Sequence, residues 1–308
     1  MSTTASGMDD LRGSYDLVDE AKTFWNAKLC GSEFVEDRST RTAFFEGLTR
    51  TRQELEPHIP EIVQFERWAD RDVLEIGCGL GTDGERFGRA GARYTAVDLS
   101  REPLALTQER FELAGLPGRF VNASATALPF EGASFDLVYS HGVIHHIPPI
   151  EQVVAEIHRV LRPGGTALIM VYNRTSLNYQ VNIRLLRRAG ALMLTLPRGM
   201  EITKRLTGER DEVLEGHLQL LHEHGPRYVR DLDLFLNHNT DGPGNPHSTV
   251  WSAAEANRLF SAFASVHHQV RLLNLRSYPA AIRDRIPLAL EARLGRRFGW
   301  HRYIVAVK

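Results

Sequence analysis

The chain has 308 residues, of which 43% are hydrophobic and 24% are charged, so it can bury a full core. Its formal net charge of −1 gives no support to nucleic acid as the main partner. Two cysteines are too few for a disulfide framework, and no apolar run has the length of a membrane span or the form of a signal peptide. We therefore expect a cytoplasmic protein without an integral membrane segment.

The first 70 residues are predicted to form a tail followed by helices. Residues 1–12 are polar and acidic, which is typical of disorder. Residues 15–68 are expected to be helical, with several aromatic residues at apolar positions. Such aromatics usually belong to a core.

A regular alternation of strands and helices begins at residue 71. Short apolar runs predict strands at 72–76, 93–98, 119–122, 135–140 and 166–172, with helices between them. This order predicts an α/β fold with a doubly wound, mostly parallel sheet. Two more strands are expected at 266–273 and 301–307, which makes seven. We assign 71–173 to a cofactor-binding core, 174–250 to an inserted helical cap over a substrate pocket, and 251–308 to the completion of the core sheet.

Three glycines follow the first strand at alternate positions, namely Gly77, Gly79 and Gly81. Glycine has no Cβ, so a ligand can approach the backbone of such a turn closely. A helix is expected at 82–90. Strand, glycine loop and helix together form the first unit of a nucleotide-binding fold, although glycine loops of this kind also occur by chance.

Asp98 closes the second strand, 21 residues after Gly77. This is close to the spacing at which an acidic residue meets a ribose in dinucleotide-binding folds. A carboxylate at a strand tip can accept hydrogen bonds from both ribose hydroxyls. The alternative is that Asp98 only caps the helix expected at 101–114.

Folds that bind NAD and folds that bind S-adenosylmethionine (SAM) share these two features. The spacing here is G-x-G-x-G rather than G-x-G-x-x-G, and an acid, Glu75, precedes the loop. Further motifs follow: Leu-Pro-Phe at 128–130, Ser-Phe-Asp at 134–136, Gly-Val-Ile-His-His at 142–146 and Leu-Arg-Pro-Gly-Gly at 161–165. With this set, the chain resembles the class I SAM-dependent methyltransferases, in particular the bacterial branch near the quinone-biosynthesis methyltransferases.

The resemblance is strong over about residues 71–173. It implies a Rossmann-like methyltransferase fold with an antiparallel last strand, SAM as the cofactor and S-adenosylhomocysteine (SAH) as the product. The residues that it places against the cofactor are Glu75, Gly77, Cys78, Gly79, Gly81, Thr82, Asp83, Asp98, Leu99, Ser100, Ser124, Ala125, Thr126, Ser140, His141, Gly142 and His146.

One of these positions departs from the family pattern. Ser124 stands where the family often has an acid that meets the adenine amino group. Adenine recognition is therefore expected to use the Ser124 hydroxyl and the backbone at Ala125 and Thr126.

Methyl transfer needs the acceptor, the methyl group and the sulfur held in line, and a base only when the acceptor keeps a proton. His145 is the candidate base, because it follows the fourth strand in the loop that faces the acceptor in this family. Adjacent residues seldom face the same way, so His146 is expected to contact the cofactor instead. Tyr172 is the alternative catalytic residue. The expected substrate contacts are Asn173, His238 and, on a lid formed by the first helix, Tyr15 and Trp25.

We expect a methyltransferase acting on a small molecule, such as a prenylated, aromatic or quinone-like specialised metabolite. The alternatives are an NAD-dependent oxidoreductase and a non-catalytic module that binds SAM. The histidine spacings match no metal-binding arrangement, so we expect no metal. The amphipathic run at 183–196 is interpreted either as a solvated helix face or as a cap over an apolar substrate. The sequence leaves the acceptor, the methylated atom and the oligomeric state open, homo-oligomers included.

Overall fold

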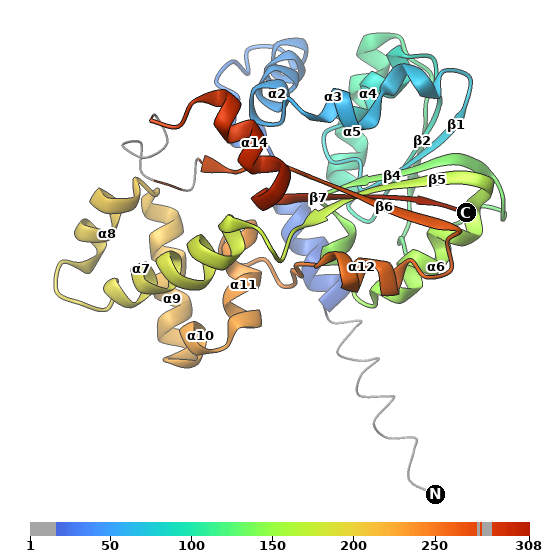
Figure 1. The fold of residues 1–308 in the computed structure, drawn as a ribbon. Coiled ribbons are helices and arrows are strands. Elements are labelled where there is room, and N and C mark those ends of the chain that lie inside the picture. The colour runs from blue at the N-terminus through green and yellow to red at the C-terminus, as the bar shows by residue number, and fades with distance from the viewer. Residues whose placement is uncertain (1–16, 276–277, 279–284) are drawn as a thin grey trace, which may run out of the picture. The chain divides into compact units, whose positions relative to one another are not determined.

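The computed structural model describes residues 17–275, 278 and 285–308 (Figure 1). The chain divides into two compact units. The first comprises the residues up to 171 together with 254–268 and 303–308, and the second comprises 172–253 and 269–302. Among the described residues, no helix is both long enough and apolar enough to cross a membrane.

A seven-stranded sheet has the order β3-β2-β1-β4-β5-β7-β6. Its strands are β1 (Asp72–Ile76), β2 (Arg93–Asp98), β3 (Arg119–Asn122), β4 (Phe135–His141), β5 (Leu161–Tyr172), β6 (Ser265–Arg271) and β7 (His301–Val307). The first five strands pair in parallel. The predicted α/β fold class and seven strands are confirmed.

Strand β7 runs antiparallel to β5. The amide of Gly164, near the start of β5, donates to the carbonyl of Lys308, just after the end of β7. The amide of Asn173, just after β5, donates to the carbonyl of Trp300, just before β7. The pairing thus runs in opposite directions along the two strands, as the family resemblance implies.

Helices cover both faces of this sheet, with α4 and α5 on one face and α6 and α12 on the other (Figure 1). The helices of the first unit are 17–27, α2 (Arg41–Leu55), α3 (Ile59–Val63), α4 (Thr82–Arg89), α5 (Arg101–Ala114), α6 (Ile150–Val160) and α12 (Ala253–Leu259), with short 3₁₀ turns η1 (Ser32–Phe34), η2 (Phe65–Trp68) and η3 (Ile144–His146). The sheet order reverses between β1 and β4. A doubly wound sheet binds ligands at this point, beyond the carboxyl ends of the strands.

The core of the first unit explains why these segments form strands and helices. Val73 and Leu137 are fully buried in adjacent strands, and Phe87 and Phe111 pack on them from α4 and α5. Strands buried on both faces read as continuous apolar runs, which is the pattern at 137–139 and, interrupted only by Glu75, at 73–76.

The second unit is mainly helical and has a core of its own. Its helices are η4, a π-helix (Asn178–Arg187), followed by α7 (Arg188–Met193), α8 (Gly199–Thr207), α9 (Asp211–His224), α10 (Arg227–Arg230), α11 (Leu232–Thr240) and α14 (Leu288–Phe298). Tyr228 and Phe235 are fully buried in its centre, with Ile183 and Leu214 around them.

Candidate functional site

The glycine loop leaves the carboxyl end of β1 with three left-handed residues. Gly77, Gly79 and Gly81 have φ values of +75°, +53° and +70°, which glycine adopts most readily. The Gly77 amide donates to the Val97 carbonyl of β2 at 2.7 Å, so the loop starts from a fixed position. Gly81 then precedes the first residue of α4.

The three glycines have different neighbours. A Cβ at Gly77 would collide with the side chain of Val143, and a Cβ at Gly81 would lie 2.8 Å from a methyl group of Thr107. A Cβ at Gly79 would meet no atom within 4 Å. The loop is thus packed by protein at its two ends and open at Gly79, which leaves the backbone accessible there.

Asp98 ends β2 beside this opening. One oxygen of its carboxylate accepts from the Ser100 amide at 2.8 Å, and the other accepts from the Gly79 amide at 3.4 Å. Burial raises the pKa of Asp98 to about 6, against the opposing effect of these two amides. The Cys78 thiol also donates to Oδ2, at 3.9 Å. A carboxylate has about four lone-pair sites, so these donors, two of which are at long distance, leave acceptor capacity for further hydroxyl groups.

The segments after β2 and β3 are fixed by an asparagine that sequence reasoning missed. The side-chain amide of Asn122 donates to the carbonyls of Asp98 and Leu99, each at 2.9 Å. Ser100 is buried and precedes α5. The expected adenine contacts Leu99 and Ser100 are therefore held next to Asp98 by the neighbouring strand.

Ser124 closes a local turn after β3. Its hydroxyl lies 2.7 Å from the Thr126 hydroxyl and accepts from the Thr126 amide at 3.2 Å. Ala125 between them is buried. The predicted adenine contacts at 124–126 form one hydrogen-bonded unit at the carboxyl edge of the sheet.

Asp83, in the first turn of α4, takes part in a buried ion pair that the sequence did not reveal. The Arg52 guanidinium of α2 donates to Asp83 Oδ2 at 2.7 Å, and the Tyr139 hydroxyl of β4 donates to the same oxygen at 2.8 Å. Burial opposes ionisation of Asp83, but the charge and hydrogen bond of Arg52 keep its pKa below the usual value. The second oxygen, Oδ1, is buried and has no hydrogen-bond partner among the described residues.

Glu75 lies one strand position before the loop and is buried. Burial and the nearby charge of Asp83 raise the pKa of Glu75 well above the usual value. The Tyr94 hydroxyl donates to Glu75 Oε2 at 2.5 Å. This pair lies against Gly84 of α4, where a Cβ would collide with Tyr94. Glu75 thus helps to hold the helix that follows the loop.

The end of β4 carries the next three predicted residues. The Ser140 hydroxyl donates to the Ile76 carbonyl at 2.9 Å and ties β4 to the end of β1. Gly142 has a φ of +75°, and its amide donates to the Met170 carbonyl of β5. The strand ends at the switch point are therefore linked to one another.

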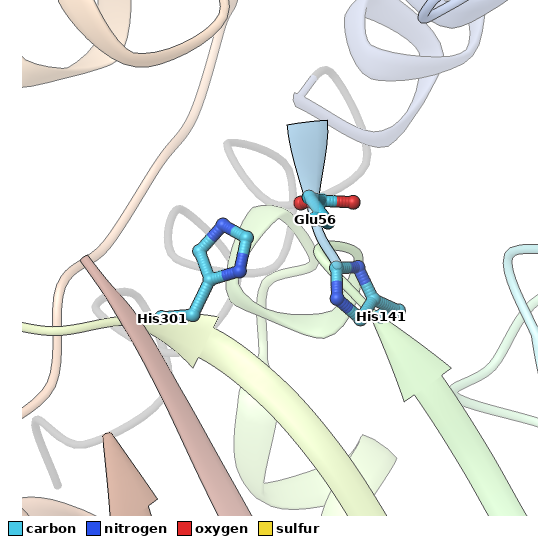
Figure 2. Close-up of side chains that lie close together, drawn as sticks. All are labelled: Glu56, His141 and His301. Carbon is cyan, nitrogen blue, oxygen red and sulfur yellow. The ribbon is translucent and has the colours of Figure 1, made fainter. Parts of the chain in front are cut away.

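His141 belongs to a polar cluster whose other members the sequence did not suggest. The Tyr303 hydroxyl lies 3.0 Å from His141 Nε2 and 3.0 Å from His58 Nε2. A hydroxyl has only one proton, so it donates to one ring at most, and a neutral ring on its other side must donate to it. Glu56, the residue after α2, joins this cluster, because one of its carboxylate oxygens lies within 4.8 Å of a ring nitrogen of His141 (Figure 2).

His145 and His146 lie together in η3. Their rings are 4.1 Å apart at 43°, and both side chains are buried, with 1% of His145 exposed. The Trp25 ring meets His146 edge to face at 5.2 Å. The structure thus brings together one predicted lid residue and the predicted cofactor-side histidine. Tyr15 lies outside the described residues.

Three predicted residues lie in the second unit. The Tyr172 hydroxyl donates to Asp241 at 2.8 Å, and its ring stacks on Trp300 at 4.3 Å. The Asn173 side chain is fully buried and donates to the Gly299 carbonyl at 2.8 Å, while its oxygen accepts from Arg302. His238 Nδ1 accepts from the Gly244 amide at 3.1 Å.

Known proteins resemble the centre of this chain. Residues 74–169 match the family model described as a methyltransferase domain. The chain is 39% identical over 121 residues to the phthiotriol/phenolphthiotriol dimycocerosates methyltransferase 1 of Mycobacterium ulcerans. This match covers 37% of this chain and 44% of that protein. It is 32% identical over 129 residues to the sterol 4-C-methyltransferase strm-1 of Caenorhabditis elegans. This match covers 41% of this chain and 38% of that protein. The matches thus span less than half of these two relatives.

A solved structure from Pyrococcus horikoshii OT3, that of the PH0226 protein, aligns with 93% of this chain and 98% of its own. The TM-score is 0.50 and the sequences are 15% identical. At this identity the alignment supports the fold alone.

Proposed function

Because residues 74–169 match a methyltransferase domain and the chain is similar to named methyltransferases, we propose that it is a SAM-dependent methyltransferase that transfers the methyl group of SAM to a small-molecule acceptor. The observation that carries the proposal is the Asp98 carboxylate beside the open backbone at Gly79. The residues present fit the cofactor, since the carboxylate keeps acceptor capacity for a ribose diol and the loop has room at its centre.

Bound SAM would supply a methyl group already activated by a positively charged sulfur. The chain would position this group. We propose that Asp98 accepts from the two ribose hydroxyls and that the backbone of Gly77 to Gly81 borders the methionine portion. The buried Oδ1 of Asp83 would accept from the amino group of that portion. Holding the reactants in line can lower a barrier by up to about 7–11 kcal/mol.

An acceptor that keeps a proton needs a base. His145 is the proposed base. Because His145 is buried beside His146, the acceptor group that loses the proton has to enter the fold to reach the imidazole ring. Tyr172, whose hydroxyl donates to Asp241, is the proposed alternative. The two candidates lie in different units, so separate substitutions distinguish them.

We propose an acceptor with a large apolar part. The two named relatives carry a dimycocerosate and a sterol in their names, and prenylated or quinone-like metabolites share this character. Transfer of labelled methyl groups from SAM into apolar extracts, compared with polar metabolites, tests this proposal.

Calorimetry with SAH tests the cofactor site without any acceptor. The wild-type chain should bind SAH and should show no binding of NADH. Asp98→Asn removes a charged acceptor and should make the free energy of SAH binding less favourable by about 1.5–3 kcal/mol. Asp136→Asn is the matched control, because Asp136 lies near the start of β4, where it accepts from the Asp72 amide and from Arg162, at the opposite edge of the sheet.

Equal SAH affinity of Asp98→Asn and the wild type would show that Asp98 does not bind the ribose. Binding of NADH but not SAH would replace the proposal by an oxidoreductase. Binding of SAH without methyl transfer to any extract would support a module that only binds the cofactor.

A further inference from the structure

Exposed apolar side chains gather in one part of the second unit. Of the nine large hydrophobic side chains that are exposed among the described residues, six lie between positions 185 and 206. They are Leu185, Leu186, Leu192, Leu196, Ile202 and Leu206. Scattered exposed leucines are ordinary, but such a concentration marks a surface that contacts an apolar partner.

These side chains are not needed by the core of the unit. The segment 178–207 comprises η4, α7, the turn after it and α8, and α7 packs against both η4 and α8 (Figure 1). Its inward positions, such as Ile183, Ala191 and Leu194, already belong to the buried cluster. Ile202 and Leu206 are four residues apart in α8 and therefore share one face of that helix.

The same segment is strongly basic. Residues 178–207 contain six arginines and lysines and one acidic residue, a net charge of +5, whereas the rest of the chain has a net charge of −6. Arg184 and Arg205 are exposed and form no ion pair among the described residues. Arg198 and Lys204 are also exposed, but each is paired with an acid, Glu201 and Asp211 respectively.

We propose that the segment 178–207 docks on the surface of an anionic lipid bilayer. Exposed leucines beside basic side chains are the features of helices that lie at the boundary between headgroups and acyl chains. The leucines would enter this boundary, and Arg184 and Arg205 would meet lipid phosphates. Arg187 and Arg188 donate to the carbonyls of Asn239 and Val229, so the exposed cations of the segment are Arg184, Arg198, Lys204 and Arg205. These exposed cations select an anionic membrane over a neutral one and over an apolar protein surface. This inference does not depend on methyl transfer.

Flotation of the full chain with lipid vesicles tests the proposal without cofactor or acceptor. One set of vesicles contains only phosphatidylcholine, and the other also contains phosphatidylglycerol. The wild type should bind the anionic vesicles, and added salt should weaken the binding. Leu192→Ser with Leu206→Ser should lower the partition coefficient roughly tenfold or more. Arg184→Ser with Arg205→Ser should lower it roughly 30-fold.

Leu113→Ser with Arg71→Ser is the matched control, because both residues are exposed in the first unit. All these positions are on the surface, so the variants should keep the circular dichroism spectrum of the wild type. Failure of the wild type to float with anionic vesicles would overturn the proposal, and so would leucine variants that float equally well. A concentration-dependent dimer that the leucine substitutions dissociate would identify the surface as a contact between copies instead.

Discussion

Replacing Arg52 by methionine removes a cation that forms ion pairs with two carboxylates, that of Asp83 in α4 and that of Glu56 just after α2. Arg52 Nη2 is 2.7 Å from Asp83 Oδ2, and only 4% of Asp83 is exposed. After the substitution, the Tyr139 hydroxyl is the remaining donor to that oxygen. Removing one partner of a buried ion pair typically destabilises a protein by about 3–5 kcal/mol, because the other charge stays uncompensated. We expect a loss of this size at neutral pH, measured by urea unfolding.

The dependence on pH separates lost charge from lost packing. In the wild type the pKa of Asp83 is lowered, so its contribution is present above the unfolded pKa and is lost as the pH falls through the folded pKa. In Arg52→Met burial acts unopposed by that cation and raises the pKa of Asp83. The deficit relative to wild type should therefore be largest near neutral pH and shrink as the solution becomes acidic enough to protonate Asp83 and Glu56, the two carboxylates that Arg52 contacts.

A control on the same helix sets the scale. Arg41 pairs with Glu109 at 3.1 Å, but its side chain is 58% exposed, so Arg41→Met should cost less than about 1 kcal/mol. The double variant Arg52→Met with Asp83→Asn should be more stable than Arg52→Met alone. If Arg52→Met is as stable as the Arg41 control, or has the same deficit at every pH, the ion pair does not hold the start of α4.

Two further predictions concern the proposed activity. Since the pKa of Asp98 is about 6 and its ionised form is the better acceptor, SAH affinity should be full above pH 7 and fall as the pH drops through about 6. Calorimetry over this range checks it, and a flat profile would contradict the assignment of Asp98. His145→Gln should slow turnover by roughly 10²–10⁴-fold with unchanged SAH affinity, while His267→Gln, at an exposed histidine, should match the wild type. An unchanged rate with the true acceptor would exclude His145 as the base.

The sheet could be predicted from sequence because its signals are local. Apolar runs marked the strands, and Gly77, Gly79 and Gly81 marked a turn that requires positive φ. Asp98 followed from its position at a strand tip. Such features depend on neighbouring residues alone, so no knowledge of the tertiary contacts was needed.

The buried partners could not be predicted in this way. Arg52 is 31 positions from Asp83, and Tyr303 is 162 positions from His141. Nothing in the local sequence distinguishes Arg52 from the other arginines of α2. The run at 183–196 was recognised as amphipathic, but apolar spacing did not reveal that its first part forms a π-helix, η4.

A crystal structure of the chain with SAH tests the central proposal most directly. We predict both ribose hydroxyls within about 3.2 Å of the Asp98 carboxylate and the thioether beside the backbone of Gly79. SAH bound elsewhere, or a Gly79 backbone that makes no contact with the ligand at saturating SAH, would contradict the proposed cofactor site.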